Sequence, residues 1–129
     1  MRKSIIIIFV VFLSSCEFPI GLWFDNIQLS TKSASFKSNG DSIIIKTGGS
    51  SWWMAEVSIN NEYIRDSLQR NWFNDMFKVE LDSFRIERRD KNTLFVKATK
   101  NNYKTQRQLL ITLESGDYFG HLTITQNGQ

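Results

Sequence analysis

Apolar and polar residues alternate along most of the chain beyond residue 34, and this alternation predicts β-strands. A period of two places successive side chains on opposite faces of a strand. The pattern predicts strands at 42–47, 53–59, 108–113 and 118–126, and a hairpin at 84–98 with its polar turn at 89–92. Several short strands separated by polar turns indicate a single all-β domain, either a sandwich or a barrel.

Glycine-containing turns separate these strands. Asn39-Gly40 and Gly48-Gly49 bound the strand at 42–47, and Ser115-Gly116-Asp117 separates the last two strands. Glycine accepts a positive φ without steric cost, so we expect these positions to turn the chain.

The stretch 60–76 departs from the alternation. Ile64, Leu68, Trp72 and Met76 are spaced four residues apart, which is the spacing of neighbours on a helix. A short helix and a long loop with hydrophobic anchors are both compatible with this stretch.

The first residues have the pattern of an export signal. Arg2 and Lys3 precede the apolar run 5–13, and nine residues are too few for a membrane-spanning helix, which needs roughly 20. The run ends in Leu13-Ser14-Ser15-Cys16, which resembles the lipobox of bacterial lipoproteins. That resemblance implies removal of 1–15 and acylation of Cys16, and several acyl chains anchor a protein firmly. We therefore expect a signal peptide (1–15), a lipidated Cys16 with a tether (16–33), and a folded domain (34–129). The alternative is a soluble secreted protein with one free thiol.

Removing the signal changes the charge balance. The whole chain has 16 Lys and Arg residues against 13 Asp and Glu, and loss of Arg2 and Lys3 leaves a net charge of +1. This small excess does not favour nucleic-acid binding. Cys16 is the only cysteine, so the domain depends on its core rather than on an internal disulfide.

The second half of the chain resembles BACON-type domains of Bacteroidota. The resemblance covers roughly 35–126. It is carried by Asn101-Asn102, Arg107, Gly116 to Phe119 and the terminal Leu122-Thr-Ile-Thr-Gln126, with Gly48-Gly49 followed by Trp52-Trp53 upstream. It implies an immunoglobulin-like β-sandwich of about seven to eight strands that binds carbohydrate, including mucin glycans. The stretch 60–76 is longer than the corresponding segment of that family, and no catalytic module accompanies the domain.

Trp52, Trp53 and Trp72 are the candidate ligand-binding residues. The apolar faces of sugar rings stack on aromatic side chains, which also offer a polar group. Adjacent residues on a strand face opposite ways, so one of Trp52 and Trp53 should lie in the core and the other outside. The competing interpretation is that the outer ring packs under the stretch 60–76.

Other polar residues give no catalytic or metal site. His121 is the only histidine and should face outward, without the partners that a metal needs. Glu80 and Asp82 should share a solvated strand face, and Arg85, Arg88, Arg89 and Lys91 should form a solvated hairpin tip. Arg107 matches a recurrent arginine of the BACON family, and we expect it to brace a turn or nearby carbonyls.

The sequence thus predicts a non-catalytic lipoprotein of the cell envelope, without cofactors, that binds a glycan or assists a glycan-handling system. The alternative is a structural lipoprotein that docks another envelope protein. Family resemblance favours the outer membrane and leaves the periplasmic and surface faces open.

Overall fold

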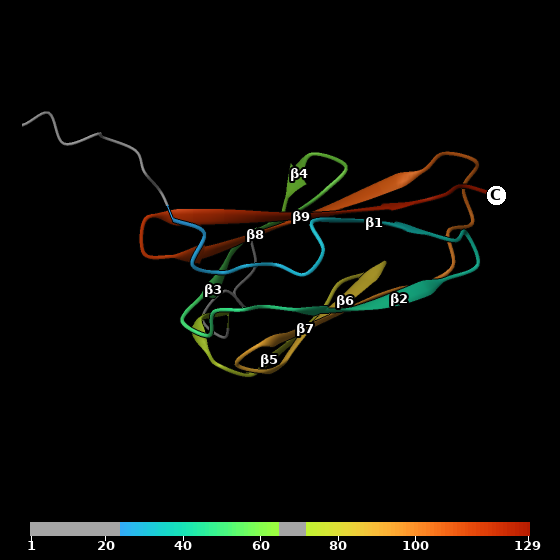
Figure 1. Cartoon of the computed structure of the whole chain (residues 1–129). Coiled ribbons are helices and arrows are strands. Elements are labelled where there is room, and N and C mark those ends of the chain that lie inside the picture. The colour runs from blue at the N-terminus through green and yellow to red at the C-terminus, as the bar shows by residue number, and fades with distance from the viewer. Residues whose placement is uncertain (1–23, 65–71) are drawn as a thin grey trace, which may run out of the picture.

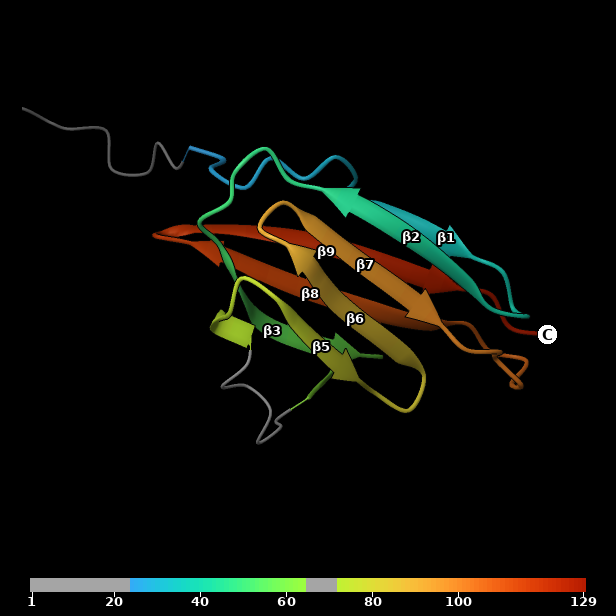
Figure 2. The ribbon, with the colours of Figure 1, turned by 90° about the horizontal axis from the view of Figure 1, so that it is seen from below.

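Two β-sheets packed face to face make up the fold (Figures 1 and 2). The computed structural model describes residues 24–64 and 72–129. The five-stranded sheet has the order β1-β9-β8-β3-β4, and the four-stranded sheet has the order β2-β7-β6-β5. The strands are β1 (Ser33–Phe36), β2 (Asp41–Lys46), β3 (Trp53–Ile59), β4 (Glu62–Tyr63), β5 (Phe77–Glu80), β6 (Phe84–Asp90), β7 (Thr93–Ala98), β8 (Arg107–Ser115) and β9 (Tyr118–Gln126). The expected all-β sandwich is confirmed, with nine strands in the described residues.

The predicted strands match the observed ones closely. β3 and β9 have the predicted bounds, and β6 and β7 form the predicted hairpin. All strand pairs are antiparallel except β1 and β9, which run parallel from Ser33↔Thr123 to Phe36↔Gln126. The alternation was sufficient to find these strands because one face of each sheet is buried.

The core lies between the sheets. Inward-facing residues of both sheets are almost completely buried, among them Met54, Val57, Ile86, Leu94, Val96, Ile111, Leu113 and Leu122. Their neighbours along each strand face outward. This burial of alternate side chains supplies the main stabilisation of the fold, at about 25 cal/mol per Å² of apolar surface.

The segment before β1 is part of this packing. Ile27 is fully buried in the core, although it lies within the stretch 16–33 that the sequence assigned to a tether. Its carbonyl oxygen accepts a hydrogen bond from the Gly49 N–H, and that of Gln28 accepts one from Gly48. Packing therefore begins several residues before position 34.

The glycine pair Gly48-Gly49 has a different role from the one predicted. Gly40 and Gly116 have positive φ angles of 109° and 59°, as turn glycines should, whereas Gly48 and Gly49 do not. A Cβ atom on Gly49 would lie 1.8 Å from the carbonyl oxygen of Asn26. The pair is needed because another backbone segment passes too close for a side chain.

The beginning of the stretch 60–76 is a tight hairpin. Asn60 and Asn61 turn the chain with φ angles of 51° and 67°, a conformation that asparagine tolerates, and β4 follows. The middle of the stretch, 65–71, lies outside the described residues, as do the predicted signal and Cys16. The described parts, 60–64 and 72–76, form no α-helix. Within the described ranges, no helix is long and apolar enough to span a membrane.

Candidate functional site

The three candidate tryptophans have different environments. Trp52 and Trp72 are only 3% and 1% exposed, so their rings face the interior. The Trp52 Nε1–H donates to Thr47 Oγ1 at 3.0 Å. Trp53, the next residue on the chain, lies on the opposite face and is half-buried. The expected division between Trp52 and Trp53 is therefore observed, and Trp53 is the one of the three with ring surface open to a ligand.

Arg88 does not belong to a solvated hairpin tip, and the prediction that placed it there is wrong. It is 2% exposed, and its guanidinium lies 3.6 Å from the centroid of the Trp52 ring. Its Nη1–H and Nη2–H groups donate to the carbonyl oxygens of Trp52 and Ser50, both at 2.7 Å, and to that of Lys91 at 2.9 Å. Burial lowers the pKa of Arg88 from its usual value, partly opposed by Asp75 and Asp90. The alternation along β6 places Arg88 inward, and the surrounding carbonyls satisfy it there.

Glu80 and Asp82 do not form a paired site. β5 ends at Glu80, so Asp82 lies in the following turn rather than on the same strand face. Glu80 forms ion pairs with Lys78 at 3.2 Å and Arg85 at 2.7 Å. This outer face of the four-stranded sheet carries charges of both signs.

Three of the residues that carry the BACON resemblance, Arg107, Gln126 and Asn101, hold one end of the sandwich together. Arg107 donates to Gln126 Oε1 at 2.6 Å and to the Thr99 carbonyl oxygen at 2.7 Å. The fully buried Gln126 side chain donates to the carbonyl oxygen of Lys37 at 2.9 Å. The Asn101 side chain donates to a carbonyl oxygen 26 residues away. The expected structural role of Arg107 is confirmed, and these motif residues do not point to a ligand.

A row of three outward-facing side chains crosses the five-stranded sheet at its other end. Trp53 pairs with Glu114 in the register of β3 and β8, and Glu114 pairs with Phe119 in the register of β8 and β9. The Trp53 Nε1–H donates to Glu114 Oε2 at 3.2 Å. The exposed Phe73 ring lies 6.2 Å from the Trp53 ring, between centroids. We call Trp53, Glu114 and Phe119 the aromatic row.

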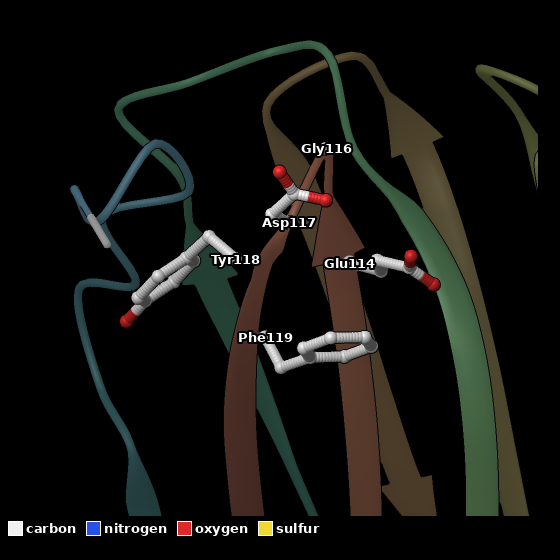
Figure 3. A pocket seen from close by; sticks show the side chains of 5 residues that line it. All are labelled: Glu114, Gly116, Asp117, Tyr118 and Phe119. Atoms are coloured by element: carbon white, nitrogen blue, oxygen red, sulfur yellow. The ribbon is translucent and has the colours of Figure 1, made fainter. Parts of the chain in front are cut away.

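A concavity of about 430 Å³ lies against the end of this row, in the β8–β9 hairpin. It is lined by Glu114, Gly116, Asp117, Tyr118 and Phe119 (Figure 3). Tyr118 points away from Glu114 and Phe119, toward the segment before β1. There its hydroxyl donates a hydrogen bond to the Asp25 carboxylate. Burial raises the pKa of Tyr118, and the Asp25 carboxylate raises it further.

A second concavity, of about 700 Å³, adjoins the row on the other side of Phe119. It is lined by Ala55, Glu56, Tyr63, Ile64, Thr112, Phe119 and His121. A β-bulge between Met54 and Glu56 shifts the register of β3 by one residue. The extra residue lets Glu56 face outward while Met54 and Val57 both remain buried.

The sequence pattern did not single out Glu114, Phe119, Tyr63 or Glu56 as ligand-binding residues. His121 was expected on the outer face and is exposed there, with its Nδ1 3.2 Å from Thr112 Oγ1. Phe119 lies two residues earlier on the same strand, so the same alternation would have placed it beside His121. The pairing with Trp53 required the register of three strands.

The arrangement has the chemistry of a binding surface. Among the residues that the structure describes, no three His, Cys, Asp or Glu side chains are grouped closely enough to hold a metal ion. The exposed side chains of Phe119 and Tyr63 and the half-buried ring of Trp53 lie beside carboxylates, a threonine and a histidine. Such a surface can stack against an apolar face and hydrogen-bond the groups around it.

Comparison with solved structures finds the same fold in a protein from Bacteroides thetaiotaomicron, with a TM-score of 0.68 and 17% identity over 86% of this chain and 93% of that one. A Bacteroides ovatus GH5 xyloglucanase, solved with a heptasaccharide, has a TM-score of 0.49 and 13% identity over 80% of this chain and 19% of that one. Titin domain M7 has a TM-score of 0.46 and 12% identity over 78% of this chain and 91% of that one. No protein-family model and no curated protein matches the chain. The first similarity shows a shared β-sandwich, and the other two are too distant to support an argument.

Proposed function

We propose that this protein is a non-catalytic, BACON-like binding module that holds a carbohydrate on the outer face of its five-stranded sheet. The observation that carries the proposal is the aromatic row, in which two partly exposed rings flank a carboxylate. Ring C–H faces of a sugar would stack on Trp53 and Phe119, and sugar hydroxyls would donate to Glu114.

The rest of the surface supports this choice of face. Phe73 extends the row beyond Trp53, and two concavities adjoin it. By contrast, Trp52 and Trp72 are buried, so Trp53 is the candidate that we retain for ligand contact. Pockets that combine aromatic surface with a few polar groups are typical of small-molecule sites.

We test the proposal with an array of plant, host and microbial glycans and the purified protein. The Trp53→Ala and Phe119→Ala variants should each lose at least tenfold in affinity, since stacking area is removed. Tyr103→Ala is the matched control because Tyr103 is 72% exposed and lies at the other end of the sandwich. Binding that is unaffected by both site variants would contradict the proposal.

The lipid anchor is the second part of the proposal. Its support is the sequence alone: the short apolar run and the Leu13-Ser14-Ser15-Cys16 pattern. Mass spectrometry of the native protein should find residues 1–15 removed and acyl mass on Cys16, and Cys16→Ser should release the protein from membranes. An intact residue 1, or a Cys16 without acyl mass, would refute the anchor.

Docking of an envelope protein is the alternative function, and it would use the same exposed face. Cross-linking in intact membranes distinguishes the two. A stoichiometric partner that is lost in Phe119→Ala, together with a silent glycan array, would favour docking.

A further inference from the structure

We infer that the site takes an uncharged oligosaccharide of at least two sugar units, one on each side of Phe119, and that it discriminates against anionic glycans. The inference rests on the proposed function and specifies its ligand class.

Phe119 is the residue that joins the two concavities. It lines both the one at the β8–β9 turn and the one beside β4. The ring is 51% exposed, so a ligand can contact it from either side. A single sugar unit would occupy one concavity, whereas a linear chain can cross the ring and occupy both.

A second, polar row lies beside the aromatic row. Glu56 pairs with Thr112 beyond the bulge in β3, and Thr112 pairs with His121 in the β8–β9 register that also pairs Glu114 with Phe119. Phe119 and His121 are two residues apart on β9, which corresponds to about 7 Å along a strand. Hydrogen bonding of Thr112 to His121 Nδ1 leaves Nε2 to meet a ligand hydroxyl. The exposed Tyr63 borders this second row from β4.

The charge of the lining determines which glycans fit. Glu114, Asp117 and Glu56 supply three carboxylates, and among the residues that the structure describes, neither concavity is lined by lysine or arginine. Carboxylates accept hydrogen bonds from sugar hydroxyls. They repel sulfate, uronate or sialic acid groups, which would bind here without a countercharge. The cationic side chains Lys78, Arg85 and Arg89 lie instead on strands of the opposite sheet.

The charge part is tested with matched pairs of glycans. Oligosaccharides of two to six glucose, xylose, mannose or galactose units are compared with the same chains carrying a sulfate, a uronate or a sialic acid. The uncharged member of each bound pair should bind at least tenfold more tightly. The double variant Glu114→Gln with Asp117→Asn should reduce the ratio of the two affinities at least threefold. Equal or preferred binding of the anionic members would overturn the inference.

The length part is tested by calorimetry with one to four units of each sugar. Affinity should rise at least tenfold between one unit and three. His121→Ala should remove most of that gain, whereas Phe119→Ala should weaken binding of one unit and of three. Equal affinity for one unit and three, or a gain unaffected by His121→Ala, would overturn it. Thermal unfolding of each variant checks that these surface changes leave the fold intact.

The two proposals fail in different ways. Trp53-dependent binding without length or charge preference removes only this inference. A silent array removes the proposed function and the inference together. Binding to vesicles of neutral phospholipid is measured as well. Trp53-dependent binding to vesicles and to no glycan would identify the face as a lipid contact and would overturn both the proposed function and this inference.

Discussion

Arg88 and Arg89 show how much the environment of one residue type can differ between neighbours. Arg88 is buried against Trp52 and donates to backbone carbonyls of three separate segments, whereas Arg89 is exposed and pairs with Glu87 at 3.0 Å. Arginine suits the inner position because its planar fork can donate several hydrogen bonds at once. Arg88 therefore joins the loop before β3 to the β6–β7 hairpin.

Replacement of Arg88 should strongly destabilise the protein. Arg88→Met leaves several buried carbonyl oxygens without donors, at about 1–3 kcal/mol each, so we expect a loss of about 3 kcal/mol or more in the free energy of unfolding. Urea unfolding measures it. Arg89→Ala is the matched control, and exposed positions usually change stability by less than about 0.5 kcal/mol. Equal effects of the two substitutions would contradict the structural role of Arg88.

At the scale of elements, contacts between segments decide which local residues are possible. Gly49 is a strong case because the segment 24–28 passes directly over it. Gly49→Ala should cost about 2 kcal/mol or more, since a backbone oxygen rather than a flexible side chain occupies the space. Gly116→Ala is the comparison: no atom lies within 4 Å of its Cβ position, so only the positive φ adds a cost of about 1 kcal/mol. Thermal unfolding should rank the two in that order, and the reverse order would be inconsistent with the close approach.

The turn between β6 and β7 makes stability depend on pH. The backbone N–H of Asn92 and the hydroxyl of Thr93 donate to the Asp90 carboxylate at 2.8 and 2.9 Å, and these bonds lower the pKa of Asp90. A lowered folded-state pKa means that the contribution is present above the ordinary aspartate pKa and is lost as the pH falls through the lowered value. Asp90→Asn should flatten the fall in stability between about pH 5 and pH 2. Urea unfolding across that range measures it, and parallel curves for the two proteins would refute it.

At the scale of the whole molecule, the two ends of the sandwich have separate roles. One end is held by Arg107, Gln126 and Asn101. The other carries the aromatic row, and the first described segment of the chain reaches the β8–β9 turn at this same end, where Asp25 interacts with Tyr118 (Figure 1). Eight peptide links separate Cys16 from Phe24, a reach of at most about 28 Å. With the proposed anchor in place, the binding face would therefore lie near the membrane.

The segment before β1 should be essential to the fold. A chain that begins at Phe24 should keep its stability, whereas a chain that begins at Ser30 loses the fully buried Ile27 and should lose about 2–5 kcal/mol. Calorimetry of both chains tests this. Equal unfolding temperatures would show that residues 24–29 are only a tether.

Six of the nine strands in the described residues, namely β2, β3 and β6 to β9, were predictable, because alternation depends only on which face of a strand meets the core. The short strands β1, β4 and β5 were not, since two to four residues are too few to show a period. The outward position of His121 and the opposite faces of Trp52 and Trp53 followed from the same rule. The solvated position assigned to Arg88 was wrong, because the charge of its neighbours suggested a turn while the strand in fact continues to Asp90. The role of Gly48-Gly49 was also missed, since nothing local reveals that residues 26–28 pass over them.

The sequence by itself determined the strands, their inward and outward residues, and the expectation of an exported lipoprotein, because each of these depends on residues that are close along the chain. Only the tertiary structure decided that Trp53 rather than Trp52 is available to a ligand, and that Glu114 lies beside it. Those two residues are 61 positions apart, and their contact depends on the register of β3 with β8 and on the bulge in β3. Register is set by packing of the whole sheet against the core, so no local pattern could specify it.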